Sequence, residues 1–270
     1  MSITDSAVAV AAARAGAAVV RTCYGKALAR LDKGSGDFAT AADIEAEREI
    51  LDVLGAARPH DGVLAEESGR TGPDGAQRVW LVDPLCGTLN FAARTMLAST
   101  NVALRVDGTT TVAACADPFA DEVFWTDGTR SWVRHGGTDE PLLPSAKSGL
   151  VDVNLDPPFP NAPAFRAGRL LTDPGFTPPF RPRVVSTALA VAWVAAGRRA
   201  AYVTDGRMCD SVHFAAGIAL CRAAGCVVTG LHGQPLDSGV GGLLVAADEE
   251  THRALSALIA KQFAAGHDEF

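Results

Sequence analysis

The segment from Trp80 to Phe91, WLVDPLCGTLNF, combines residue types that suit phosphate chemistry. A run of apolar residues brings Asp83 to the end of a predicted strand, and the proline after it fixes the start of a turn. Gly87 and Thr88 then open a predicted helix, whose first backbone N–H groups have no partner within the helix and would face an anion. The spacing therefore predicts a phosphate-binding turn beside a carboxylate.

A second carboxylate, that of Glu66, also follows a short apolar run, so acidic residues recur at predicted strand ends. Hard divalent cations prefer oxygen ligands. Glu66, Asp83 and the backbone carbonyl of Leu85 therefore form a candidate Mg²⁺ site, in which the cation would in turn bind phosphate. Metal and phosphate are expected to share one cleft.

Two predicted strands and one helix must position these groups. The apolar runs Val63–Ala65 and Val79–Val82 are typical of short buried strands, and each leads into an acidic residue. Before them, Thr40 can cap a helix whose apolar positions alternate with glutamates, which indicates an amphipathic surface helix with acid near its start. Read alone, Asp43 in this helix is an early acid that suits the helix dipole.

The remaining N-terminal sequence contains a long helix and a run of strands. The helix is predicted from the Thr4 cap to about Ala29. From Asn101 to His135, short β-rich stretches alternate with turn dipeptides, as in an antiparallel meander. The stretch from Pro141 to Pro182 is rich in proline and shows little periodicity, which favours a crossing between subdomains or a loop over a site.

Helices and strands alternate beyond this stretch. They are predicted at Thr187–Ala196 (helix), Ala200–Val203 (strand), Ser211–Ala224 (helix), Cys226–Thr229 (strand), Leu243–Ala246 (strand) and a last helix capped by Asp248. Such alternation indicates a layered α/β arrangement. We therefore predict an N-terminal α+β subdomain at residues 1–145, which carries the metal and phosphate motifs, and a C-terminal α/β subdomain at residues 146–270.

Composition restricts the class of protein. The 270 residues carry 24 Lys and Arg against 31 Asp and Glu, a formal charge of −7, so no net positive field attracts a nucleic-acid backbone. The apolar stretch Ala7–Val20 is interrupted by Arg14 and Gly16 and looks too short to cross a bilayer, and no basic segment precedes it. The six cysteines form no C-x-x-C pair, which argues against a disulfide framework or a structural zinc site. We expect a cytoplasmic protein that binds neither nucleic acid nor membrane.

The segment at Trp80 resembles the W-x-x-D-P-[IL]-D-G-T-x-N-F signature of the inositol monophosphatase family, within the wider group of Mg²⁺-dependent, lithium-sensitive phosphatases. Further matches, in agreeing order and spacing, are Thr40-x-x-Asp43, Ala65-Glu66-Glu67-Ser68, Arg183-x-x-Ser186-Thr187 and Ala215-Ala216-Gly217. The resemblance implies a five-layered αβαβα sandwich of the inositol monophosphatase/fructose-1,6-bisphosphatase type, commonly a homodimer. It also implies hydrolysis of a small phosphomonoester by metal-activated water, without a covalent intermediate.

The resemblance also implies roles for individual residues. They are metal binding by Glu66, Asp83 and the Leu85 carbonyl, orientation of the attacking water by Asp43 and Thr88, and substrate binding by Gly87, Thr88, Ser186 and Thr187. The implied reaction is in-line attack on phosphorus. The metals and the turn amides would carry the charge that builds on the phosphoryl oxygens.

Two residues depart from the family pattern, both at its second metal site. Cys86 stands where the signature has its second aspartate, and His213 where the motif W-D-x-A-A-G has its aspartate. In one account Mg²⁺ is kept, because Asp210 sits one helical turn before His213 and could reach the vacated place. In a second, Asp83, Cys86 and His213 bind a softer ion such as Zn²⁺. In a third, the site is empty, which leaves either a one-metal enzyme or one with little phosphatase activity. The sequence leaves all three open.

Two functions from different classes follow. The first is a phosphoric monoester hydrolase that uses Mg²⁺, with Mn²⁺ or Zn²⁺ as alternatives at the altered site, and acts on an inositol phosphate, a sugar phosphate or a nucleoside monophosphate. The second is a catalytically impaired protein that binds a phosphorylated metabolite and has lost the second metal site. The departures at Cys86 and His213 favour the second function. Retention of Asp43 and Thr88 favours the first, because a binding protein has no evident use for a pair that orients water.

Overall fold

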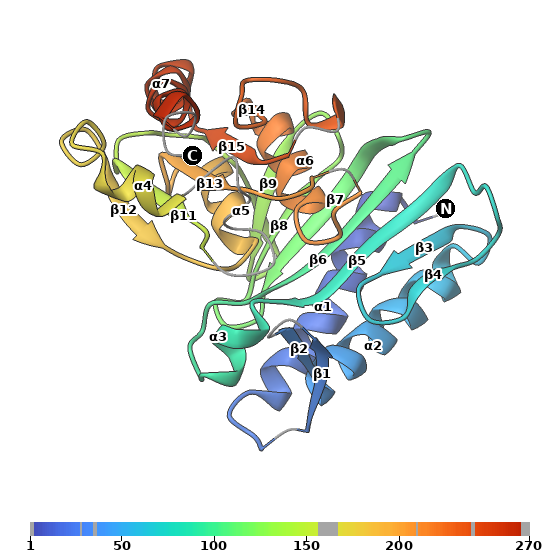
Figure 1. Cartoon of the computed structure of the whole chain (residues 1–270). Coiled ribbons are helices and arrows are strands. Elements are labelled where there is room, and N and C mark those ends of the chain that lie inside the picture. Colours follow the sequence, from blue (N-terminus) through green and yellow to red (C-terminus); the bar gives the residue numbers. More distant parts are fainter. Residues whose placement is uncertain are drawn as a thin grey trace.

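Helices and two β-sheets of this protein are stacked in five layers (Figure 1). The computed structural model describes residues 3–27, 29–34, 37–155, 167–208, 210–238 and 241–265. In order, the layers are α1 (Asp5–Cys23) with α2 (Ala41–Ala57), an eight-stranded sheet, α5 (Leu189–Ala195) with α6 (Ala215–Ala224), a five-stranded sheet, and α4 (Ala167–Thr172) with α7 (Glu249–Ala265). This arrangement confirms the predicted αβαβα sandwich.

The eight-stranded sheet brings the two acidic strand ends together. Its strands follow in the order β10-β9-β8-β7-β6-β5-β3-β4. Strand β3 is parallel to β5, with Ala65 opposite Val82, so the residues that follow, Glu66 and Asp83, lie at the same edge. The strands are β3 (Gly62–Ala65), β4 (Gly69–Thr71), β5 (Arg78–Cys86), β6 (Ser99–Val106), β7 (Thr109–Asp117), β8 (Glu122–Thr126), β9 (Ser131–His135) and β10 (Thr138–Pro141).

Strand β5 is longer than the run Val79–Val82 predicted from the sequence. It continues through Asp83 to Cys86, with an irregularity in its pairing to β6 between these two residues. Asp83 is therefore part of a strand and fully buried, instead of standing beyond its end. The predicted antiparallel meander from Asn101 to His135 is confirmed by the pairing of β6 to β9.

Helix α1 packs on the sheet through small side chains. Its N-terminus is capped by Thr4, whose hydroxyl accepts the backbone N–H of Ala7 at 3.2 Å. Its buried residues from Val8 to Ala17 form an apolar cluster with Trp80 and neighbouring strand residues, and Val20 and Cys23 join a second cluster with Leu85. Gly16 permits the close approach of α2, since a Cβ atom at this position would lie 2.7 Å from Ile50 Cδ1. This close packing fixes α2 on the sheet.

The end and the environment of α1 differ from the prediction. The helix ends at Cys23, before the expected end near Ala29, because Tyr24 is extended and Gly25 has a φ of +76°. Among the described residues, α1 is the one helix whose length and composition would allow a membrane span, so the expectation of too short a stretch does not hold. Half of its apolar window is buried, and it packs on β6, β7 and α2 as a core helix does.

Helices α5 and α6 fill the space between the sheets in one apolar cluster with residues of both. Both helices begin later than the sequence predicts. Helix α5 begins at Leu189 instead of Thr187, and α6 begins at Ala215 instead of Ser211. Residues 212–214 form a turn before α6, in which Ser211 Oγ accepts the Phe214 N–H at 3.4 Å. His213 therefore lies on this turn and not on the helix.

The five-stranded sheet has the order β12-β11-β13-β15-β14 and mixes parallel with antiparallel pairs. Helices α4 and α7 cover its outer face (Figure 1). As predicted, Asp248 caps α7, because its carboxylate accepts the Thr251 N–H at 2.8 Å. The strands are β11 (Leu150–Val153), β12 (Arg181–Val184), β13 (Ala201–Thr204), β14 (Val227–Thr229) and β15 (Leu243–Ala246).

Short elements complete the fold. They are the hairpin of β1 (Arg30–Gly34) and β2 (Asp37–Thr40), the helix α3 (Thr88–Ala92) and a 3₁₀ turn at Leu236–Ser238. Of the proline-rich stretch, residues 156–166 lie outside the described residues. The proposed boundary at residues 145 and 146 falls between β10 and β11, which belong to different sheets. Division into two subdomains stays a prediction.

Candidate metal and phosphate site

A reciprocal hydrogen-bond pattern at the start of α2 orients Asp43. The Thr40 hydroxyl accepts the Ala42 N–H at 3.2 Å, and the hydroxyl and backbone N–H of Thr40 donate to Asp43 Oδ2 at 2.6 and 2.7 Å. Asp43 is fully buried; burial raises the pKa of its carboxyl group, against the hydrogen bonds from Thr40 and Thr88 that lower it. The predicted cap is confirmed, and it holds Asp43 facing Thr88.

Thr88 meets Asp43 from the start of α3. Its hydroxyl lies 3.0 Å from Asp43 Oδ1 and 3.0 Å from the backbone oxygen of Leu85. Because a hydroxyl has one proton, it donates to one of these oxygens at a time. Gly87 is required before it, since this residue has a φ of +102° and a Cβ atom would lie 2.6 Å from Leu97 O. The structure thus brings the predicted pair together.

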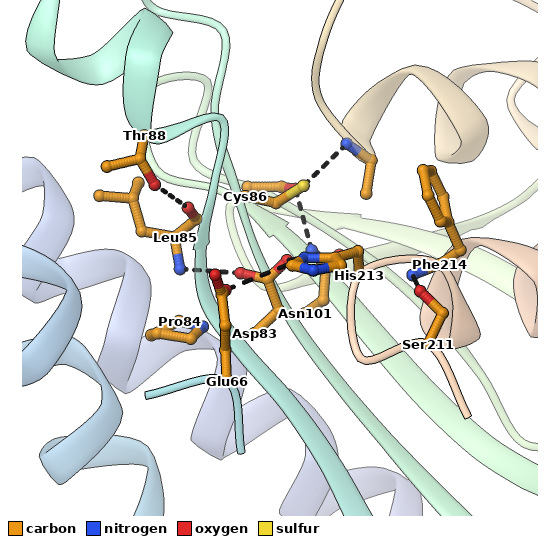
Figure 2. A network of polar contacts seen from close by, with 12 residues as sticks. Glu66, Asp83, Pro84, Leu85, Cys86, Thr88, Asn101, Ser211, His213 and Phe214 are labelled. Carbon is orange, nitrogen blue, oxygen red and sulfur yellow. Dashed lines mark hydrogen bonds and ion pairs between the residues drawn. The ribbon is translucent and has the colours of Figure 1, made fainter. Parts of the chain in front are cut away.

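Two of the carboxylates predicted to bind Mg²⁺, Glu66 and Asp83, lie close together at the ends of β3 and β5, and Leu85 follows two residues after Asp83 (Figure 2). The buried Asp83 accepts the Leu85 N–H on Oδ1 at 3.1 Å, and the Glu66 N–H donates to Val82 O at 3.0 Å. Burial, and then the negative charge of Asp83, raises the pKa of Glu66 to about 8. Two adjacent carboxylates and a backbone carbonyl are hard donors whose charge a divalent cation would neutralise, so they fit Mg²⁺.

Lys33 is a site residue that the sequence patterns do not reveal. From the hairpin β1–β2, its ammonium group donates to Glu66 Oε1 at 2.8 Å and to Glu67 Oε1 at 2.6 Å. Burial alone would lower the pKa of Lys33, but the two carboxylates raise it, so the amine is charged. A positive charge therefore lies on the carboxylate that is expected to bind Mg²⁺, and it competes with that cation.

Cys86, three residues after Asp83 on β5, and His213, from the turn before α6, meet beside Asp83 (Figure 2). His213 Nδ1 lies 2.8 Å from Asp83 Oδ2 and 3.9 Å from Glu66 Oε2. One ligand atom from each of Asp83, Cys86 and His213 lies within 4.8 Å of the other two. Burial alone would lower the pKa of His213, but Asp83 and Glu66 raise it to about 9, and burial raises that of the Cys86 thiol well above its ordinary value. Both departures from the family pattern thus fall within the site.

Asp210 does not join this cluster. Its side chain is half exposed and forms an ion pair with Arg105. Asn101, and not Arg105, is the β6 partner of Asp83, and the two β6 residues are four positions apart, roughly 13 Å along a strand. Asp210 also has a φ of +57°, which interrupts a helical path to His213. The account in which Asp210 restores a Mg²⁺ ligand is therefore corrected: this carboxylate has a different partner.

The segment before α5 reaches the same site. Asn90 Nδ2, in α3, donates to Ser186 O at 2.7 Å and to Leu97 O at 3.0 Å. Thr187 Oγ1 donates to Cys86 O at 3.3 Å. Ser186 and Thr187, both predicted to bind substrate, thus lie against the phosphate turn. Asn90 holds Ser186 there, whereas Thr187 is held by its own hydrogen bond to Cys86. The place of Asn90 in the sequence motif is the signal that could have indicated its role.

Glu47 supports the turn that carries Glu66. This α2 residue is almost fully buried, and its carboxylate accepts the Glu67 N–H at 2.8 Å and the Ser68 N–H at 2.9 Å. It lies four positions after Asp43 and therefore on the same helix face. The sequence pattern placed Glu47 among the acids of a surface helix, which is wrong for this residue. Its spacing from Asp43 is the signal that could have found it.

Comparisons with known proteins agree with the family resemblance of the sequence motifs. A model of the inositol monophosphatase family matches residues 4–266. The chain belongs to the inositol monophosphatase family. Inositol-1-monophosphatase of Mesorhizobium japonicum is 32% identical over 246 residues, 86% of each chain. Nus factor SuhB of Salmonella typhimurium is 34% identical over 240 residues, 84% of this chain and 85% of the relative.

Solved structures of the family share the fold. The extragenic suppressor protein suhB from Bartonella henselae matches with a TM-score of 0.81 over 94% of this chain and 97% of that chain, at 27% identity. Inositol monophosphatase from Anabaena matches with a TM-score of 0.76 over 94% of each chain, at 26% identity. Family membership supports a metal-dependent phosphatase that acts on a phosphorylated small molecule. The relatives carry two different names, so they do not decide the substrate.

Proposed function

We propose that this family member is a phosphoric monoester hydrolase that cleaves a small phosphomonoester with water. The observation that carries the proposal is the hydrogen bond between Thr88 and the buried Asp43, next to the Leu85 carbonyl. Glu66, Asp83 and this carbonyl would hold Mg²⁺. When bound, Mg²⁺ supplies Lewis-acid chemistry, which lowers the pKa of water and draws charge from phosphoryl oxygen.

The chain's own groups direct the water and the phosphate. When the Thr88 hydroxyl donates its hydrogen bond to Asp43, a lone pair on the Thr88 oxygen accepts a hydrogen bond from the water molecule. This hydrogen bond orients the water. The N–H groups of the Gly87–Thr88 turn bind phosphoryl oxygens. A bond forms between the water oxygen and phosphorus while the ester P–O bond breaks. The water loses a proton and the leaving alcohol gains one, so the products are phosphate and an alcohol.

The substrate class is tested by phosphate release. Inositol phosphates, sugar phosphates and nucleoside monophosphates are offered to metal-stripped protein that receives Mg²⁺, Mn²⁺ or Zn²⁺. Turnover of one ester with the wild-type chain is the expected result, and Asp83→Asn is expected to abolish it. Asp121→Asn is the matched control, because Asp121 is an exposed acid whose φ of +55° asparagine tolerates. Full activity of Asp83→Asn would rule out the proposed metal site.

A second candidate, a phosphometabolite-binding protein, rests on one specific observation. Cys86 and His213 occupy two positions where the family pattern has carboxylates, and Asp210 does not compensate because it pairs with Arg105. Such a protein would bind one of the esters in calorimetry and release no phosphate with any of the cations. That result would replace the hydrolase proposal.

The assembly and location of the protein are also proposals. We infer a homodimer and a cytoplasmic location, both supported by the family resemblance and by the expectations from the sequence. Light scattering on the purified chain measures the mass of the assembly, and fractionation of the source cells locates the chain. A monomer, or recovery with membranes, would contradict the respective proposal.

A further inference from the structure

Asp83, Cys86 and His213 offer three different kinds of ligand atom to one point in space. A carboxylate oxygen, a thiol sulfur and an imidazole nitrogen lie within 4.8 Å of one another. A tetrahedral zinc site with bonds of about 2.0–2.3 Å has neighbouring ligand atoms about 3.3–3.8 Å apart. The three separations are at most 4.8 Å, so they exceed this spacing by no more than about 1.0–1.5 Å.

The chemistry of these donors does not fit a second Mg²⁺. Magnesium takes oxygen ligands almost exclusively, whereas sulfur and imidazole nitrogen favour borderline or soft cations. Three protein ligands with a fourth position left for water or substrate is the common pattern of catalytic zinc sites. The residue types thus point away from magnesium at this position and toward a cation such as Zn²⁺.

The groups around the three residues hold them in place for a cation. Cys86 Sγ accepts the Ala188 N–H at 3.2 Å, a contact that stabilises negative charge on sulfur. Asp83 is fully buried, and the Leu85 N–H binds its Oδ1, which leaves Oδ2 directed at His213 Nδ1 at 2.8 Å. These two atoms share a proton in a hydrogen bond, and a cation that displaces this proton would have both atoms as neighbours. Such outer contacts orient ligands in metal sites.

We propose that Asp83, Cys86 and His213 form a binding site for a thiophilic divalent cation, zinc foremost, beside the magnesium site of Glu66, Asp83 and Leu85. The chain then combines a hard site and a soft site that share Asp83. The soft site deepens the proposed function, and the magnesium site next to it rests on that proposed function. Binding of the soft cation itself is measured without turnover.

The probe is Co²⁺, added to metal-stripped full-length chain and followed by absorption. Cobalt bound by a thiolate gives a charge-transfer band in the near ultraviolet, and a tetrahedral site gives visible bands. We expect both bands to saturate at one equivalent and Zn²⁺ to remove them, whereas Mg²⁺ leaves them unchanged. Absence of the ultraviolet band in the wild-type chain would overturn the proposal.

Variants separate this site from the other thiols. Cys86→Ser is expected to abolish the ultraviolet band and to lower the affinity for Zn²⁺ by at least about 10–100-fold. A loss of this size is typical even when the substituted residue contacts a metal ligand and not the metal itself. Cys226→Ser, a half-buried cysteine outside the cluster, keeps the band. Circular dichroism shows whether each variant is folded. A band of equal strength in Cys86→Ser would refute the assignment of the sulfur ligand.

Restoring the family carboxylates gives a test with a gain of function. Cys86→Asp combined with His213→Asp is expected to bind Mg²⁺ in place of Zn²⁺ and to lose the ultraviolet band of cobalt. Retained preference for Zn²⁺ in this double variant would contradict the proposal. A cobalt band without hydrolysis of any ester would support the soft site and refute the phosphatase. Hydrolysis with Mg²⁺ and no band would do the reverse.

Discussion

Thr88→Val tests the part of the site that orients water. The substitution keeps the shape of the side chain and removes the hydroxyl that lies 3.0 Å from Asp43 Oδ1. Asp43 has no exposed surface, so water does not replace the lost hydrogen bond. Its two hydrogen bonds from Thr40 remain. The change therefore removes one of the contacts that hold a buried carboxylate.

The size of the effect follows from this geometry. Leaving a buried acceptor without its donor costs about 1–3 kcal/mol of stability, and each kcal/mol lowers the Tm by roughly 2–4 °C in domains of this size. Without the Thr88 hydroxyl, no group of this pair accepts the hydrogen bond of the attacking water. Loss of such a positioned acceptor lowers kcat by about 10²–10⁴-fold, which raises the activation barrier by about 2.7–5.5 kcal/mol. The loss in rate is thus expected to exceed the loss in stability.

The assay measures kcat and KM for phosphate release at saturating metal, together with the Tm. Thr88→Ser keeps the hydroxyl and is expected to retain far more activity than Thr88→Val. Thr71→Val removes a hydroxyl at an exposed position of β4 and controls for the substitution itself. A wild-type kcat in Thr88→Val, with the chain folded, would refute the role of the Thr88–Asp43 pair.

Three further changes test Lys33, Glu47 and Gly16. Lys33→Gln removes a competing ammonium group from the metal carboxylate Glu66 and is expected to raise the apparent Mg²⁺ affinity roughly tenfold, about 1.4 kcal/mol. Lys26→Gln, at an exposed position, is expected to leave this affinity unchanged. Glu47→Gln keeps one acceptor for two N–H groups and is expected to lower stability by about 1.5–3 kcal/mol and to weaken metal binding. Gly16→Ala is expected to cost about 1–3 kcal/mol, because the new Cβ atom meets α2, whereas Gly55→Ala, with open space around it, stabilises the helix by about 0.5–1 kcal/mol.

Each of these has a result that would contradict it. For Lys33→Gln, a weaker affinity in a Mg²⁺ titration would show that the amine supports the site instead of competing. For Glu47→Gln, wild-type unfolding in urea and unchanged metal binding would remove its supporting role. For the glycine pair, equal shifts in unfolding free energy would mean that the close approach of α1 and α2 does not limit residue size.

Local features of the site could be predicted from the sequence because they depend on neighbours in the chain. Thr40 caps a helix and Asp43 closes the capping box three residues later. Gly87 is the residue that a left-handed turn requires, directly before Thr88. The apolar runs before Glu66 and Asp83 predicted two strands, and the structure shows that these strands are neighbours in one sheet. The alternation of helices and strands indicated a layered α/β arrangement, and the family resemblance added the order of its five layers.

Only the tertiary structure decided which distant groups meet at the metal site. Lys33 comes from a hairpin and Glu66 from a strand end, and no periodicity links the two. His213 reaches Asp83 because a turn precedes α6 where the sequence predicted helix. Asp210 is turned away by a positive φ and held by an arginine of β6. Ion pairs and metal ligands are chosen by distance in space, which depends on how the layers pack and not on the spacing of residues along the chain.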